Sequence, residues 1–306
     1  MNTQSNGMPE SPLGPQETTP VTMQLVTQTR PMYWSIRREL WENRSIYIAP
    51  LVIAGVVLIG FLIATIGRAV ATVDPAQKAA VLAERTHFAA GLMIAATFVV
   101  GVFYCLDALH GERRDRSILF WKSLPVSDLT TVLSKASIPL VVLPLITFAI
   151  VVFTQLIMLL LSTAALLMSG LSAATTTQPP LVQQPLILLY SLVVIALWHA
   201  PIYGWLLLVS SWARRAVFLW AVLPLVAVSV LEKIAFNTSY FQSMLNHRLM
   251  GFRMEAFTVN AHGTIDSVTQ LTPGNFLSTP GLWIGLAFAA AFLAAAVRMR
   301  RYREPI

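Results

Sequence analysis

Six long apolar runs, separated by polar segments, dominate the pattern of the chain. They lie near residues 46–67, 87–109, 129–160, 184–209, 216–235 and 281–298. Each approaches or exceeds the roughly 20 residues that a helix needs to cross about 30 Å of hydrocarbon. The third run continues to about Gly170, and Pro139 and Pro144 predict a kink in it. The pattern predicts an all-α integral membrane protein with six transmembrane helices.

The composition agrees with a membrane location. Hydrophobic residues make up 56% of the chain and charged residues only 11%, whereas about a quarter of the residues in an average soluble domain are charged. No Asp, Glu, Lys or Arg occurs from Ala136 to Ala213. The single Cys105 excludes an internal disulfide, and its apolar surroundings predict that it packs as a small hydrophobic residue.

The first residues differ from the rest of the chain. Residues 1–30 are polar and proline-containing, and they lack the apolar core of a cleavable signal, so we expect a disordered cytosolic tail. Residues 31–306 are expected to form a single six-span domain. Residues 31–44 have the spacing of an amphipathic helix that lies on the membrane surface, with tryptophans at headgroup depth. The residues expected to hold it there are Trp34, Arg37, Arg38, Glu39 and Trp41.

The basic residues predict the orientation of the spans. With the start of the chain in the cytosol, the outer side holds only six of the 21 lysines and arginines: Arg68, Lys78, Arg85, Lys233, Arg248 and Arg253. The positive-inside rule favours this topology, with both termini cytosolic. The segment 111–124 then lies in the cytosol, and residues 236–280 form an outer excursion. Helix-like spacing from Phe241 to Phe257 predicts a short helix there, which we expect to cap the bundle rather than to gate it.

The most informative segment lies between the second and third spans. Five consecutive charged residues, Glu112 to Arg116, precede the apolar side chains of Ile118, Phe120 and Trp121. An apolar knob surrounded by charges suits docking to a soluble partner, and Pro125 would end the helix in a stiff corner. The alternative is an ordinary cytosolic loop with surface ion pairs worth at most about 1 kcal/mol each.

The residues of this segment also resemble a known signature. Glu112-Arg113, Ser117-Ile118, Trp121, Pro125-Val126-Ser127 and Ser134-Lys135 are similar to the coupling-helix region in membrane subunits of ABC type-2 exporters. The resemblance covers roughly residues 31–306, although Arg116 stands where glycine is common in that family. It implies a permease whose coupling helix docks a separate ATPase. The expected docking residues are Glu112, Arg113, Arg114, Asp115, Arg116, Ser117, Ile118, Phe120, Trp121 and Pro125.

The energy source must lie outside this chain. None of the four lysines stands in the Gly-Lys-Ser/Thr sequence of a phosphate-binding loop. We therefore expect no cofactor and no enzymatic activity in this chain, and ATP and Mg bound by a partner ATPase. The resemblance implies two ATPase copies and a second permease chain, most simply a homodimer in a bacterial inner membrane. Membrane lipid is a further expected partner, and nucleic acid is not.

The sequence indicates less about the transported cargo. The candidate translocation path consists of Thr154, Gln155, His199 and Tyr203. The apolar spans favour an amphipathic or hydrophobic cargo, such as a lipid, peptide or drug-like molecule. Two other classes stay open: an intramembrane enzyme and a membrane scaffold or sensor that transports nothing. The five histidines form no His-Glu-x-x-His pair, and no catalytic or metal-binding residue is predicted.

Overall fold

The computed structural model describes residues 31–69, 75–115, 117, 126–168, 183–258, 265 and 267–302. The predicted tail, residues 1–30, lies outside these ranges, and the division into a tail and one domain stays a prediction. The described chain is helical, with one isolated antiparallel bridge between Phe257 and Leu271. Its long helices are α2 (Ser45–Ala69), α3 (Pro75–Ala108), α7 (Leu143–Met168), α8 (Gln183–Trp212), α9 (Val217–Phe236) and α13 (Pro280–Tyr302).

The six predicted spans are confirmed as long helical segments. Six segments of the described chain are long and apolar enough to cross a membrane: Ser45–Thr65, Thr86–Arg114, Asp128–Ala164, Gln183–Trp212, Val217–Phe236 and Pro280–Tyr302. Each overlaps one of the apolar runs. The protein is therefore an all-α membrane protein with six candidate spans.

The third span changes its helical geometry near its start. It consists of α6 (Asp128–Ser137), a π-helical turn at Ile138–Val142, and α7. Ser127 begins α6 as an N-cap, because its hydroxyl accepts a hydrogen bond from the Thr130 N–H at 3.1 Å. Pro139 has no N–H to donate within the helix, and the π turn occurs where Pro139 lies. The predicted kink site is thus a π turn.

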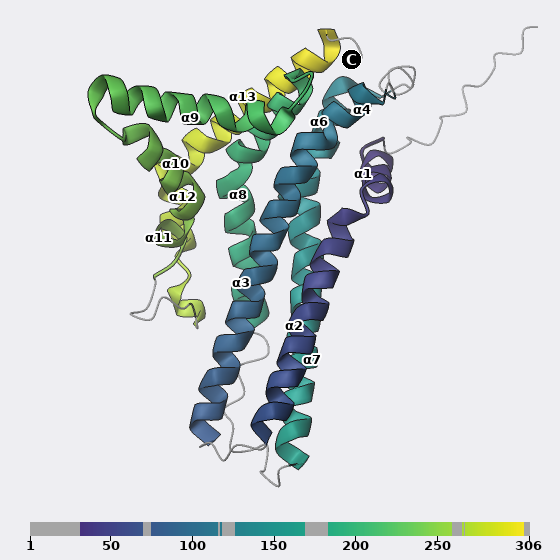
Figure 1. Cartoon of the computed structure of the whole chain (residues 1–306), viewed down its shortest axis with the longest axis vertical. Helices are drawn as coiled ribbons and strands as arrows, with labels where there is room; N and C mark the ends of the chain where they lie inside the picture. Colours follow the sequence, from purple (N-terminus) through teal and green to yellow (C-terminus); the bar gives the residue numbers. More distant parts are fainter. Residues whose placement is uncertain are drawn as a thin grey trace, which may run out of the picture.

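Helix α8 lies at the centre of the bundle. Figure 1 shows α2, α3, α7 and α8 running beside one another along the longest axis of the molecule. Helix α8 packs most extensively against α13 and also contacts α3 and α7. Gly204 permits this approach, because a Cβ there would lie only 3.2 Å from the Ala289 carbonyl oxygen. Trp198 and Leu207 of α8 are fully buried, and Cys105 of α3 is buried as predicted.

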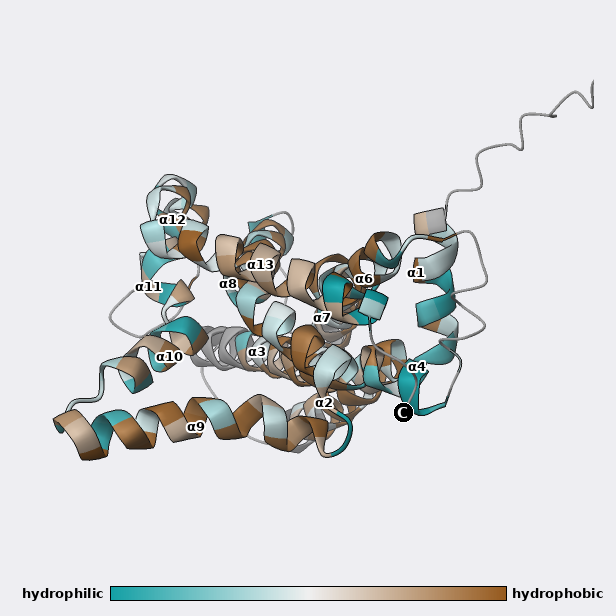
Figure 2. Cartoon of the chain, turned by 90° about the horizontal axis from the view of Figure 1, so that it is seen from above, coloured by the Kyte–Doolittle hydropathy of each residue, from teal (hydrophilic) through white to brown (hydrophobic). Residues whose placement is uncertain are grey.

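Two short helices mark one end of the bundle. Helices α1 (Pro31–Glu42) and α4 (His110–Arg114) lie there with the start of α6 and the C-terminal part of α13 (Figure 1). We call this the charged end, because its buried residues include Glu39, Glu112, Lys135 and Arg300. Seen from above, α1 is viewed from the side, with its axis in the plane of the picture, so it lies across the axis of the bundle (Figure 2).

Helix α9 departs from the direction of the other long helices. Figures 1 and 2 both show it lying across the bundle, and almost none of it is buried. Residues in the left-handed conformation flank it: Ala216 with φ 50° and Asn237 with φ 51°. Its first turns are anchored to α8 by the Trp205 indole N–H, which donates to the Ala221 carbonyl at 3.0 Å, and near its end Glu232 accepts from the Tyr240 and Phe241 N–H groups of the next helix. The sequence predicted this helix as a span that runs with the other five, whereas in the structure it lies across them.

The predicted short helix within the 236–280 excursion is confirmed. The described elements of this segment are α10 (Tyr240–Met250), α11 (Phe252–Ala256), a 3-10 turn at Val268–Gln270 and α12 (Pro273–Ser278). They pack against α8 and the start of α13. Buried Phe257 and Phe276 form a cluster with Trp198 and Leu282. The segment therefore rests on the side of the bundle.

Candidate functional site

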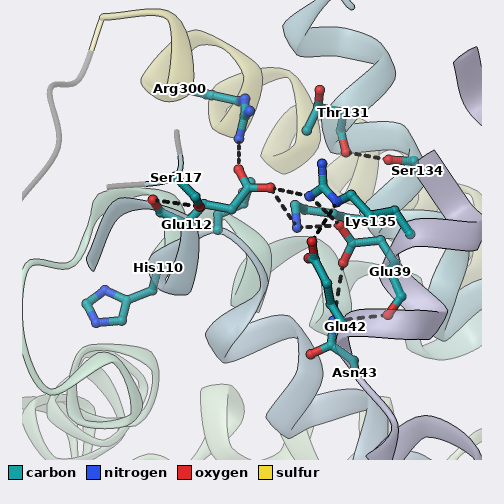
Figure 3. Close-up of polar contacts among 12 residues, drawn as sticks. Glu39, Glu42, Asn43, His110, Glu112, Ser117, Thr131, Ser134, Lys135 and Arg300 are labelled. Carbon is teal, nitrogen blue, oxygen red and sulfur yellow. Dashed lines mark hydrogen bonds and ion pairs between the residues drawn. The ribbon is translucent and has the colours of Figure 1, made fainter. Parts of the chain in front are cut away.

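Glu112 of α4 is the meeting point of three cations at the charged end. Arg38 Nη2 of α1 lies 2.8 Å from Glu112 Oε1, and Lys135 Nζ of α6 lies 3.1 Å from the same oxygen. Arg300 of α13 donates from Nη1 to Oε2, the other oxygen. Figure 3 shows the carboxylate between Arg300 and Lys135. One carboxylate thus joins helices from the start, the middle and the end of the described chain.

A second buried carboxylate completes the network. Glu39 Oε1 of α1 accepts from Lys135 Nζ at 2.8 Å, and Glu39 Oε2 accepts from the Tyr104 hydroxyl of α3 at 2.8 Å. Arg38 Nη2 also lies 3.1 Å from Glu39 Oε1. At the edge of the network, Arg300 Nε donates to Asp128 Oδ1 at 3.1 Å. Residues of α1, α3, α4, α6 and α13 are therefore linked by charge-assisted hydrogen bonds.

The buried charges of the network are balanced by opposite charges within it. Lys135 and Glu39 are each 2% exposed, and Glu112 is 7% exposed. Removing such groups from water costs several kcal/mol per ion, so they are stable only with good partners. Burial lowers the pKa of the Arg38 guanidinium, but the Glu39, Glu42 and Glu112 carboxylates outweigh it and hold that pKa above its ordinary value. These carboxylates thus favour the charged form of Arg38.

Helix α4 is also tied to the C-terminal end of α8. The Arg113 guanidinium donates from Nη1 to the carbonyl oxygens of Ser211 at 2.9 Å and Ala213 at 3.3 Å. The Ser210 hydroxyl accepts from the His110 N–H at 2.9 Å. The last carbonyls of a helix lack partners within it and favour a nearby cation. Arg113 therefore acts as a C-terminal cap that fastens α4 to α8.

The side chains of α4 consequently divide between inside and outside. Glu112 and Arg113, which are among the expected docking residues, point into the protein, because their counter-charges and acceptors belong to this chain. Arg114 and Asp115 point outward, at 61% and 63% exposure, and pair with each other at 3.1 Å. Ser117 donates to the Glu112 carbonyl at 3.4 Å. The remaining predicted docking residues lie outside the described residues: Arg116, Ile118, Phe120, Trp121 and Pro125.

Helix α1 is also two-faced, but not quite as the sequence predicted. Trp34, Arg37 and Trp41 are exposed, as expected for an interfacial helix. Arg38 and Glu39, also expected to hold the helix at the membrane surface, turn toward the network. The reason is that the counter-charges of these two residues lie on α4 and α6. The position of α1 on the bundle is therefore fixed by ion pairs as well as by apolar contacts.

The candidate path residues separate into two places. His199 and Tyr203 of α8 both pack against Phe98 of α3, with ring centroids 5.0 Å and 6.0 Å away. A ring nitrogen of His199 also lies 3.2 Å from the Leu249 carbonyl oxygen of α10. On α7, the Thr154 hydroxyl donates to a carbonyl of its own helix. Among the described residues, no hydrogen bond links Thr154 or Gln155 to the α8 pair.

An arginine missed by the sequence analysis fastens α10 to the bundle. The Arg248 guanidinium lies 4.8 Å from the ring centroid of Trp198 on α8 and donates to the Gly281 carbonyl at 3.1 Å. It rests on Gly285 of α13, where any side chain would overlap it. Cation–π contact of this kind is attractive, particularly when the cation is partly removed from water. Because Trp198 and Gly285 are uncharged, nothing at these positions of the sequence indicated a contact with Arg248.

Comparisons with models of protein families, with characterised proteins and with solved structures found no match to this chain. The described residues contain no group of three or more His, Cys, Asp or Glu side chains arranged to hold a metal ion. The class that the fold and the hydropathy define is a multi-pass membrane protein with six candidate spans. The charged network at one end of its bundle is the candidate functional site.

Proposed function

We propose that this chain is the membrane subunit of an ATP-driven exporter, whose charged end receives the movement of a separate cytosolic ATPase. One observation carries the proposal. Glu112 contacts α1, α6 and α13 from α4, while the neighbouring Arg113 contacts α8. A helix joined to four others at one point can displace them together.

The two faces of α4 suit two separate tasks. The outward face, with Arg114 and Asp115, continues in sequence toward the aromatic residues Phe120 and Trp121, and this surface would meet the ATPase. The inward face, with Glu112 and Arg113, would pass the displacement on. Buried charge-assisted hydrogen bonds are short and strong, so the groups that they join move together when one of them is displaced.

The remaining parts of the proposal follow from the resemblance to ABC type-2 permeases. Two ATPase subunits bind ATP and Mg, and two copies of this chain form the membrane part. The chain resides in a bacterial inner membrane, with both termini and the charged end in the cytosol. The cargo is amphipathic or hydrophobic, such as a lipid, peptide or drug-like molecule, because the spans are apolar.

Docking is tested by purifying the tagged chain from its native host in mild detergent. The wild-type chain should bring a stoichiometric ATPase with it, and Trp121→Ala should lose that subunit. Arg214→Ala is the matched control, because Arg214 is an exposed cation beyond the end of α8 and outside α4. Purification of the wild-type chain alone, without ATP hydrolysis, would refute docking and favour the intramembrane enzyme or the scaffold.

Transmission is tested separately with Glu112→Gln. The amide keeps the shape of the carboxylate but removes the charge that attracts three cations. The variant should retain the ATPase and hydrolyse ATP, while its export of cargo falls at least tenfold relative to hydrolysis. If export and hydrolysis stay coupled as in the wild type, the network does not transmit movement.

A further inference from the structure

The outward face of α1 carries an arginine between two tryptophans. Arg37 Cζ lies 5.4 Å from the ring centroid of Trp34 and 5.0 Å from that of Trp41. Both distances fall within the range of cation–π attraction. Trp34 is 55% exposed and Trp41 is 70% exposed. The three residues are spaced by three and four positions, so they form one stripe along the helix.

The direction of this stripe is fixed by the opposite face of α1. Arg38 and Glu39 are held in the network by Glu112 and Lys135. Because these ion pairs set the rotation of α1 about its own axis, Arg37 cannot turn inward without breaking them. The fold therefore holds the stripe facing outward from the protein.

The N–H groups of the Arg37 guanidinium are available for further hydrogen bonds. The structure gives it no ion pair with any described residue, whereas the nearby Glu42 is paired with Arg38 at 3.2 Å. The indoles lie beside the guanidinium, and cation–π contact leaves its N–H groups able to donate. A guanidinium is a planar fork that can bind two oxygens of a phosphate at once. The stripe thus offers a cation that has no counter-ion among the residues the structure describes.

The position of the stripe indicates the source of the phosphate. Helix α1 lies across the bundle axis at the charged end (Figures 1 and 2), as a helix in the plane of a membrane surface would. Tryptophan is enriched at the depth of lipid headgroups. Helix α2 follows directly, and its first turns expose the apolar side chains of Ile48, Leu51 and Val52. A lipid headgroup at α1 would therefore have its acyl chains beside α2.

We propose that Trp34, Arg37 and Trp41 form a binding site for the headgroup of an anionic phospholipid. The phosphate accepts from the Arg37 guanidinium, and the indoles hold the guanidinium and cover the headgroup. A zwitterionic lipid is disfavoured, because its own ammonium group competes with Arg37 for the phosphate charge. Arg44, exposed at the junction of α1 and α2, adds a second positive charge nearby. This site does not depend on the proposed exporter function.

The test counts bound lipids on the full-length chain. The purified protein is incubated with equal amounts of phosphatidylglycerol and phosphatidylcholine that carry the same acyl chains, and retained lipids are identified by native mass spectrometry. Arg37→Ala should lower the ratio of bound phosphatidylglycerol to phosphatidylcholine about fivefold, the effect expected for one cation near an anionic surface. Arg37→Lys should fall between, because it keeps the charge without the planar fork.

Two further variants make the result decisive. Arg214→Ala removes an exposed cation that is not part of the stripe, and it should leave the ratio unchanged. Trp41→Leu removes one indole and should lower the ratio while leaving the charge in place. An unchanged ratio in Arg37→Ala, or an equal fall in Arg214→Ala, would overturn the proposal. Arg37 is exposed, so a monodisperse Arg37→Ala protein is expected, and its elution profile is the check on folding.

Discussion

Replacing Glu112 with alanine should destabilise the protein far more than removing any exposed charge of α4. The change leaves Lys135 and Arg300 buried and Arg38 partly buried near one another, with Glu39, Glu42 and Asp128 as their acidic partners. Removing one partner of a buried ion pair costs roughly 3–5 kcal/mol, because an uncompensated charge stays behind. We expect Glu112→Ala to lower the free energy of unfolding by about that amount.

Asp115→Ala is the matched control for this prediction. It breaks the pair between Asp115 and Arg114 on the same helix, but both side chains are more than half exposed. Exposed pairs contribute about 0–1 kcal/mol. Reversible unfolding of both variants in mixed micelles, followed by circular dichroism, gives the two free energies. Equal losses in Glu112→Ala and Asp115→Ala would refute the reasoning that burial makes Glu112 important.

A compensating substitution sharpens the same test. In the Glu112→Ala background, Arg300→Met removes one of the cations that has lost its partner. Because the two residues are in direct contact, their effects should not add. The double variant should be more stable than the sum of the single losses predicts, by at least about 1 kcal/mol. Strict additivity would show that the two side chains do not interact in the folded protein.

Other predictions follow from single contacts. Gly285→Ala should expel the Arg248 guanidinium and make α10 more accessible to protease, whereas Gly274→Ala, with open space around it, should not. Tyr104→Phe removes one hydrogen bond to the second carboxylate of the network and should cost about 1.5–3 kcal/mol of unfolding free energy, measured by the same micelle assay. Cys105 is fully buried, so it should react with maleimide only after denaturation; rapid labelling of the native protein would contradict its placement.

The spans could be predicted from the sequence because hydropathy alone decides them. Lipid has no hydrogen bonds to offer, so a long apolar run must be helical in a membrane. The same reasoning treated α9 as one more span parallel to the others, but an apolar helix satisfies its backbone at any tilt. Its placement depends on the left-handed Ala216 before it and on contacts with Trp205, which hydropathy does not encode.

The candidate site could be predicted only in part. The sequence indicated that Glu112 belongs to a charged helix between two spans, but not that it faces inward. Its partners Arg38 and Arg300 lie 74 and 188 residues away in the chain. Local spacing carries no information at such separations. Lys135 was noted only as part of the resemblance and, like Arg300, as one of the basic residues that set the orientation of the spans, because a single sequence cannot pair charges across helices.

The order in which the helices are synthesised gives the charged network a further consequence. Arg38 and Glu39 leave the ribosome first, Glu112 and Lys135 follow, and Arg300 comes with the last helix of the described chain. Domains generally acquire structure as the chain emerges. During biosynthesis, Glu112 therefore lacks Arg300, one of its three cationic partners, until α13 has been inserted. The charged end is completed only after that insertion, and a chain that stalls before α13 leaves Glu112 without Arg300.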